Sequence, residues 1–460
     1  MQRDSEKHKR IVRGRIIATS VAVLIVLFLT AGLIWGFLTL ADKVGKKFFP
    51  ENEETVTEEV PSEEPVDEIQ AEVIEKIEEL SSSEPAVSSE ELQEQYEEAT
   101  VKEETGVNAL EIEEMVAGMS LQDKVAQVFI VRPEQITGVD TVTQAGDATA
   151  AALEKYHVGG MIYFDKNLLN PDQTRSLLSK TKEFSSAGNG IPFFLAVDEE
   201  GGDVTRIAGN AEFGIENTAK MSEIGASGDT EEAYEAGKHI GEYLNDYGFN
   251  VDFAPVVDVT DSGSSAVGER SFGADPFVVS DMALEYSKGL NENGIIACYK
   301  HFPGFGRAQE STDLETVIID GVTADDLHER DLIPYDKGLR TGDKMVMIGN
   351  MSFPEITGDN NPIGMSESVI KDYLRAELGY NGVIVTDALD AAAVRNNFGS
   401  GEAAVRVLKA GADMVLCPAD FEEAYNGVLS AVESGELSED VLDGAVSRIL
   451  SLKSRTMGLK

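Results

Sequence analysis

Residues 382–389 read GVIVTDAL, in which the apolar residues 383–385 are followed directly by Thr386 and Asp387. Short runs rich in Val and Ile, bounded by Gly and polar residues, are typical of strands buried on both faces of a parallel sheet. The chain beyond residue 108 repeats this pattern, with amphipathic stretches between the runs. The runs are residues 125–132, 158–164, 192–200, 250–259, 295–302, 344–351, 382–389 and 413–418.

Eight such runs predict an α/β fold, a (β/α)8 barrel of the TIM type over residues 108–456, because eight parallel strands close into a barrel. A doubly wound sheet is the alternative, but no GxGxxG sequence follows the first run. Helical stretches fill the gaps, and several end in a Gly suited to the position just after a helix. The clearest are residues 171–184, 231–248, 366–379 and 401–411.

The N-terminal part of the chain predicts a membrane anchor. Residues 16–40 are almost wholly apolar and uncharged, which is long enough to cross a bilayer. The basic residues in 1–15 should remain in the cytoplasm and leave the rest of the chain outside. A cleavable signal peptide is the rival interpretation, but the run exceeds the usual length and no A-x-A site follows it. We therefore expect a single-pass protein of the cell membrane with an extracytoplasmic barrel.

Residues 41–107 predict an acidic, disordered linker. They are rich in Glu, Ser, Pro and Val and poor in aromatic residues, so they bury too little apolar surface to fold independently. Their like charges repel one another and extend the segment. A spacer that carries the barrel away from the membrane is the function we expect.

The composition excludes several classes of function. The formal net charge is -45, with 83 acidic against 38 basic residues, which argues against a nucleic-acid partner. The two cysteines, Cys298 and Cys417, lie in apolar runs and cannot form a disulfide framework or a metal quartet. The five histidines show no metal-ligand spacing. We expect no metal and no other cofactor.

Polar residues follow several of the predicted strands. Active sites of such barrels lie at the C-terminal ends of the strands, so polar residues there are candidates for function. A single Asp or Lys at one strand end would be weak evidence, because it is often only a cap or a solvated loop residue. Their joint occurrence at one rim predicts a site. They are Asp198, Glu200 and Arg206 after the third run, Arg270 between the fourth and fifth, Lys300 and His301 in the fifth, and Asp387 and Asp390 after the seventh.

With these residues in place, the chain resembles glycoside hydrolase family three, in particular its single-barrel β-N-acetylglucosaminidases. The resemblance covers nearly the whole barrel through GGMIYF, VDEEGG, NVDFAPVVDV, ERSFGADP, KHFPGFG, GVIVTDAL and AGADMVLCP. It implies that Asp387 is the catalytic nucleophile. It also implies that the substrate sugar is held by Asp198, Arg206, Arg270, Lys300 and His301.

The chemistry agrees with these residue types. A retaining glycosidase needs a carboxylate that attacks the anomeric carbon and a proton donor on the side of the leaving group. Asp387 suits the first role, and we expect a cationic rim of Arg206, Arg270 and Lys300 to favour its ionised form.

The loop after the fifth run departs from the family. The single-barrel members carry an Asp-Ser/Thr-His segment there, and this chain has Ser311, Thr312 and Asp313 at those positions. The usual acid/base His is therefore absent. Asp313, or Glu310 on the same loop, is a chemical alternative, because a carboxylic acid can donate a proton when its surroundings favour the neutral form.

These observations predict a membrane-anchored glycosidase of β-N-acetylhexosaminidase type. Its expected substrate is a β-linked glycan that contains N-acetylglucosamine, as in peptidoglycan. Because the acid/base His is missing, a catalytically silent barrel that only binds cell-wall glycan is a second hypothesis. A β-glucosidase-like specificity is a third.

Overall fold

The computed structural model describes residues 109–260, 265–339 and 343–459. The predicted tail, anchor and linker, residues 1–107, lie outside the described residues, so these remain predictions. None of the helices that are described is both long and apolar enough to cross a membrane.

Eight short parallel strands form one sheet within the described residues. Their order is β7-β6-β5-β4-β3-β2-β1-β8, and a parallel bridge between Val385 and Met414 joins β7 to β8. The ring of strands closes through this bridge, which confirms the predicted parallel α/β barrel. The strands are β1 (Phe129–Val131), β2 (Gly160–Ile162), β3 (Phe194–Val197), β4 (Val251–Asp252), β5 (Ile296–Phe302), β6 (Met345–Ile348), β7 (Ile384–Thr386) and β8 (Val415–Leu416).

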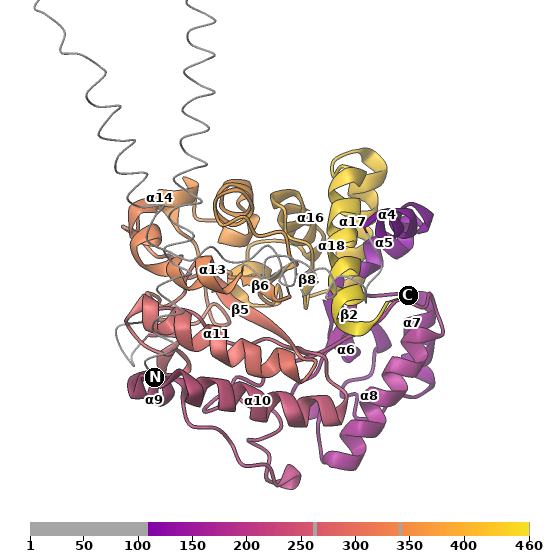
Figure 1. Cartoon of the computed structure of the whole chain (residues 1–460). Helices are drawn as coiled ribbons and strands as arrows, with labels where there is room; N and C mark the ends of the chain where they lie inside the picture. Colours follow the sequence, from indigo (N-terminus) through magenta and orange to yellow (C-terminus); the bar gives the residue numbers. More distant parts are fainter. Residues whose placement is uncertain (1–108, 261–264, 340–342, 460) are drawn as a thin grey trace, which may run out of the picture. The chain divides into compact units, whose positions relative to one another are not determined.

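Helices surround the strands, and α10 and α11 lie side by side along the outside of the barrel (Figure 1). The longer helices are α4 (Ala109–Gly118), α5 (Leu121–Gln127), α7 (Asp147–Lys155), α8 (Pro171–Ser186), α9 (Met221–Ser227), α10 (Thr230–Tyr247), α11 (Pro276–Glu292), η6 (Val369–Glu377), α16 (Ser400–Ala410), α17 (Phe421–Ser434) and α18 (Glu439–Met457). The shorter helical segments are α6 (Pro133–Thr137), η1 (Asp165–Asn167), η2 (Ala211–Phe213), η3 (Gly268–Arg270), α12 (Ala324–Asp326), η4 (Leu327–Asp331), α13 (Ile333–Gly338), α14 (Pro354–Thr357), η5 (Ile363–Met365) and α15 (Ala392–Arg395).

Each predicted run contains one strand, which is shorter than most of the runs, but the first run also includes residues that are helical. Residues 125–127 belong to helix α5, which begins after Ser120, whose side chain accepts a hydrogen bond from the backbone of Asp123 at 3.1 Å. A short apolar run cannot be assigned to strand or helix by periodicity alone when both would be buried. Here the capping Ser120 favours the helix.

The predicted helices are also present. Residues 171–184 lie in α8, 231–247 in α10 and 401–410 in α16, while the stretch at 366–379 forms the π-helix η6. Helices α10 and α16 end at Gly248 and Gly411, whose φ angles are 103° and 114°. A side chain with a β-carbon is strained in this left-handed region, which explains Gly at both positions.

A buried lysine lies at the opposite end of the barrel from the strand ends that carry the polar residues. Lys453 of α18 is fully buried and donates hydrogen bonds to the side chain of Gln127 at 3.1 Å and to the carbonyl of Gly159 at 2.9 Å. Its ammonium lies 4.6 Å from the ring centre of Phe194. Burial without a carboxylate among these partners lowers the pKa of Lys453 to about 7.

Lys453 should make the stability of the barrel depend on pH. The folded pKa lies below the unfolded value of about 10.5, so the unfolded chain binds the additional proton between these two values. Stability should therefore rise with pH from about pH 7 to pH 10, by about 1.4 kcal/mol per pH unit from this group alone. Urea unfolding of Lys453→Met should show this part of the slope removed, together with a gain in stability at pH 7. The exposed Lys182→Met on α8 is the control and should keep the wild-type slope.

Candidate active site

A cavity of about 280 Å³ opens at the C-terminal ends of the strands. It is lined by side chains of β2, β5, β6 and β8 and by residues that follow β2, β3, β4, β5, β7 and β8. Its walls include every residue that the sequence assigned to catalysis or substrate binding: Asp198, Arg206, Arg270, Lys300, His301, Asp313 and Asp387.

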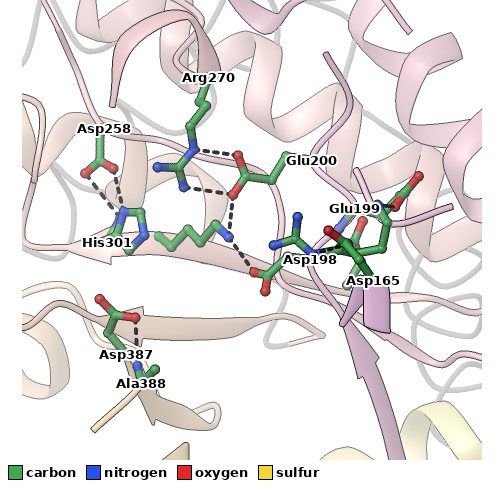
Figure 2. A network of polar contacts seen from close by, with 12 residues as sticks. Asp165, Asp198, Glu199, Glu200, Asp258, Arg270, His301, Asp387 and Ala388 are labelled. Carbon is green, nitrogen blue, oxygen red and sulfur yellow. Dashed lines mark hydrogen bonds and ion pairs between the residues drawn. The ribbon is translucent and has the colours of Figure 1, made fainter. Parts of the chain in front are cut away.

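A buried ion network forms one wall of this cavity (Figure 2). The carboxylate of Glu200 accepts two hydrogen bonds from the Arg270 guanidinium, at 2.7 and 2.8 Å. It also lies 2.6 Å from the ammonium of Lys300, which in turn lies 2.9 Å from Asp198. Only 2% of Glu200 is exposed, so its charge depends on these partners.

Electrostatics inside this network keeps its members charged. Burial alone would raise the pKa of Glu200, but the charges of Arg270 and Lys300 outweigh burial and hold this pKa well below its usual range. Burial alone would lower the pKa of Lys300, but Asp198 and Glu200 raise it above its usual value. The cavity therefore presents permanently charged, fixed groups that can hydrogen-bond the hydroxyls of a sugar.

A second buried carboxylate shapes the loop after β3. Glu199 accepts hydrogen bonds from the backbone amides of Arg206, Ile207 and Ala208, at 2.5, 3.0 and 2.9 Å. It accepts another from the hydroxyl of Tyr243 at 2.8 Å. The loop is wrapped around this side chain, which places Arg206 in the cavity wall.

Asp387 follows β7, and its carboxylate enters the cavity. Its Oδ1 accepts a hydrogen bond from the backbone amide of Ala388 at 2.7 Å. Burial raises the pKa of Asp387, the charge of His301 opposes this shift, and the charge of Asp313 adds to it. The Asp387 carboxylate thus accepts a hydrogen bond from the backbone of Ala388, and its pKa responds to the charges of two predicted site residues, His301 and Asp313.

The expected cationic rim around Asp387 is wrong in its detail. The sequence predicted that Arg206, Arg270 and Lys300 would together favour its ionised form. Arg270 and Lys300 are instead paired with acidic side chains, and Arg206 lies 3.3 Å from the exposed Asp165. Of the three predicted cations, Lys300 does lower the pKa of Asp387, but burial is the larger effect and raises that pKa overall.

The loop after β5 separates the two candidate proton donors. Ser311, Thr312 and Asp313 line the same cavity as Asp387. Glu310 lines a different cavity, of about 670 Å³, together with the return segment at residues 315–322. Of the two carboxylates that the sequence could not distinguish, only Asp313 lies in the wall that faces Asp387.

Glycine fixes the root of this loop. A β-carbon at Gly306 would lie 1.8 Å from the carbonyl oxygen of Val259, so no other residue fits without moving the backbone. Further along, Arg307 donates two hydrogen bonds to Asp331 of η4, at 3.1 and 2.9 Å. The loop that begins in the KHFPGFGR segment, residues 300–307, is therefore packed tightly at its start.

Two residues near the predicted site have other roles in the structure. Asp390, which the sequence grouped with Asp387, lies 2.5 Å from Arg132 in an ion pair and does not line the cavity.

Asp258 was not singled out, because it lies within the apolar run at residues 250–259. It is buried, and its carboxylate lies 2.8 Å from Nδ1 of His301. A charged residue inside an otherwise apolar run was the signal that could have identified Asp258.

Within the residues that the model describes, no group of three or more His, Cys, Asp or Glu side chains could hold a metal ion. Cys298 and Cys417 are both buried free thiols, and burial raises the pKa of each. Cys417 lines the cavity at the end of β8.

In fold and site, the chain is a (β/α)8 barrel with an enclosed polar pocket at the C-terminal ends of its strands, the arrangement typical of barrel enzymes. The family described as "Glycosyl hydrolase family 3 N terminal domain" matches residues 120–452. The chain belongs to this family, which confirms the resemblance seen in its sequence.

Several relatives are beta-hexosaminidases. The chain is 32% identical over 351 residues to "Beta-hexosaminidase LpqI" of Mycobacterium tuberculosis, a match that covers 74% of this chain and 84% of that protein. It is 33% identical over 334 residues to "Beta-hexosaminidase A" of Pseudoalteromonas piscicida, covering 66% of this chain and 54% of the relative. The structure of a family 3 β-N-acetylglucosaminidase from Paenibacillus superposes with a TM-score of 0.69 at 33% identity, covering 74% of this chain and 63% of that one. The chain thus spans only about half of the Pseudoalteromonas protein and less than two thirds of the Paenibacillus chain.

The buried network makes Glu200 a sensitive position. Glu200→Gln removes the charge that pairs with Arg270 and Lys300, and it should lower the free energy of unfolding by about 3–5 kcal/mol, because the buried Arg270 loses its carboxylate and Lys300 is left with Asp198 alone. Urea unfolding measures this loss. Glu402→Gln on α16 is the matched control, since Glu402 is half-exposed in its pair with Arg406, and it should change stability by less than about 1 kcal/mol. Equal losses in the two variants would contradict the importance of the network.

Proposed function

We propose that this protein is a retaining glycoside hydrolase of β-N-acetylhexosaminidase type with Asp387 as its nucleophile. One observation carries the proposal: the Asp387 carboxylate opens into the same small cavity as Asp313 and the predicted sugar-binding side chains. Family membership and the beta-hexosaminidase relatives support the substrate class.

The reaction would proceed in two steps. In the first, a carboxylate oxygen of Asp387 attacks the anomeric carbon, the glycosidic bond breaks, and a proton passes to the leaving oxygen. In the second, water hydrolyses the glycosyl ester and releases Asp387. The fixed charges of Asp198, Arg270 and Lys300 would hold the sugar hydroxyls during both steps.

Asp313 is our candidate for the proton donor. It occupies the sequence position of the missing His, and it lines the same cavity as Asp387. Glu310 is the weaker candidate, because it lines the neighbouring cavity. A loop carboxylate could then perform the acid/base role that a His performs elsewhere in the family.

The setting of the activity is also part of the proposal. The apolar residues 16–40 and the acidic residues 41–107 support a barrel held outside the cell membrane on a spacer. A cell-wall glycan that contains β-linked N-acetylglucosamine, such as peptidoglycan, is the substrate such a location would supply.

A silent glycan-binding barrel is the second candidate. The observation that favours it is the exposure of Asp313, which hydrogen-bonds the hydroxyl of Ser311 on its own loop. Such a barrel would bind N-acetylglucosamine oligomers and release no product from either an aryl glycoside or a natural disaccharide.

Trapping the intermediate tests the nucleophile. Incubation with an activated 2-fluoro glycoside should give a covalent adduct on the peptide that carries Asp387, detected by mass spectrometry. Asp387→Asn should abolish the adduct and reduce kcat/KM on an aryl N-acetylglucosaminide by about 10³-fold or more, because the attacking group is lost. Asp390→Asn is the matched control, since this neighbouring carboxylate pairs with Arg132, and it should still form the adduct. An aryl glucoside in parallel distinguishes β-glucosidase-like specificity.

The two loop carboxylates can be separated by the pH profile. The negative charge of Asp313 raises the pKa of Asp387, so Asp313→Asn should lower that pKa. The acid limb of kcat/KM on a dinitrophenyl glycoside, which needs little protonation of its leaving group, should move to lower pH. Turnover of a natural disaccharide should be lost in the same variant. Glu310→Gln should leave the acid limb and the disaccharide activity as in the wild type, and the reverse result would assign the donor to Glu310.

A further inference from the structure

The segment after β4 supports the start of the loop after β5, the loop that carries Asp313. Residues 256–260 continue beside β5, where Val256 bridges to Lys300 and the amide of Val257 donates to the carbonyl of Lys300 at 2.8 Å. The backbone of Val259 then closes against Gly306. The sugar-binding end of β5 and the first residues of the loop therefore rest on one short stretch of chain.

Asp258 lies in the middle of this stretch, and its carboxylate joins the two parts. Oδ1 accepts hydrogen bonds from the backbone amides of His301 and Phe305, at 3.2 and 2.6 Å. Oδ2 lies 2.8 Å from Nδ1 of the His301 ring. Asp258 is 1% exposed, so these contacts are made away from water (Figure 2).

The direction of these hydrogen bonds is dictated by chemistry. The two backbone amides can only donate, so Oδ1 accepts from both. An ionised Oδ2 can also only accept, which requires the proton of the His301 ring to be on Nδ1. In the neutral ring Nε2 is then left as an acceptor, and His301 is part of the cavity wall.

We propose that Asp258 is a positioning residue, which fixes the Nδ1–H tautomer of His301 and anchors the loop that carries Asp313. This inference rests on the proposed function, in which His301 binds the sugar and the loop supplies the proton. One side chain then sets both the hydrogen-bonding character of a substrate contact and the root of the catalytic loop. Phe305, whose ring packs edge to face on His301 with centres 5.7 Å apart, completes the contact between the two.

The substitution Asp258→Asn should reverse the sense of one hydrogen bond. The amide oxygen would have to keep accepting from the amides of His301 and Phe305, so the NH2 group would face Nδ1. Nδ1 would become an acceptor, and the ring proton would move to Nε2. Toward the cavity, His301 would change from an acceptor to a donor.

Nitrogen NMR of the full chain labelled with ¹⁵N-histidine tests this directly. We expect His301, assigned by its absence in His301→Gln, to carry its proton on Nδ1 in the wild type and on Nε2 in Asp258→Asn. On an aryl N-acetylglucosaminide, kcat/KM should fall by about 100-fold in Asp258→Asn, the size of effect expected when a binding group is misplaced.

Asp331→Asn is the matched control. Asp331 is a second buried carboxylate that holds the same loop, but it does so through the guanidinium of Arg307 and not through the His301 ring. It should leave the His301 tautomer unchanged, whatever it does to the rate, whereas a purely structural role of Asp258 would give the two variants the same tautomer.

The His301 tautomer of the wild-type protein tests the proposal even if Asp258→Asn does not fold. A wild-type His301 that carries its proton only on Nε2 would overturn the proposal. So would an Asp258→Asn variant that folds and retains both the Nδ1–H tautomer and the wild-type kcat/KM. The tautomer is read without substrate, so absence of glycosidase activity would count against the proposed function and leave the result on Asp258 intact.

Discussion

The buried carboxylate of Glu200 is the constraint on which the site depends. It has almost no contact with water, so its charge requires Arg270 and Lys300, which come from distant parts of the sequence. Lys300 then holds Asp198, and the three strands or loops that carry these side chains have one mutual arrangement in which all charges are satisfied. The barrel supplies the scaffold, but this network determines how the ends of its third and fifth strands face one another.

Much of the fold could be predicted because the barrel strands are buried on both faces. Runs such as GVIVTDAL begin with consecutive apolar residues, and the barrel architecture requires eight of them. The error at residues 125–127 arose because hydrophobic composition alone does not distinguish a buried helix turn from a buried strand. The feature that favours the helix there is the N-cap at Ser120, a single hydrogen bond to the backbone of Asp123 that hydrophobic composition does not reveal.

The site was predictable to a different degree. Asp387, Lys300 and His301 were identified because they follow or end apolar runs, where side chains reach the mouth of a barrel. Their electrostatics was not predictable, because the pairing of Lys300 and Arg270 with Glu200 depends on three-dimensional contacts. Asp258 was missed because it lies in a run predicted as a strand, of which only Val251 and Asp252 form β4, and its role appears only when the loop after β5 is placed against it.

The tight packing at Gly306 has a consequence for how such a site can change over time. Residues 301–306 are held by the chain after β4, and Gly306 tolerates no larger side chain, while residues 311–313 form the crest of the same loop, where Thr312 is buried and Asp313 is exposed. In the proposed function, recognition of the sugar and delivery of the proton would therefore fall to separate parts of one loop, and one part could change without the other. A lineage can lose or exchange its proton donor at the crest and keep an intact sugar-binding floor beneath it.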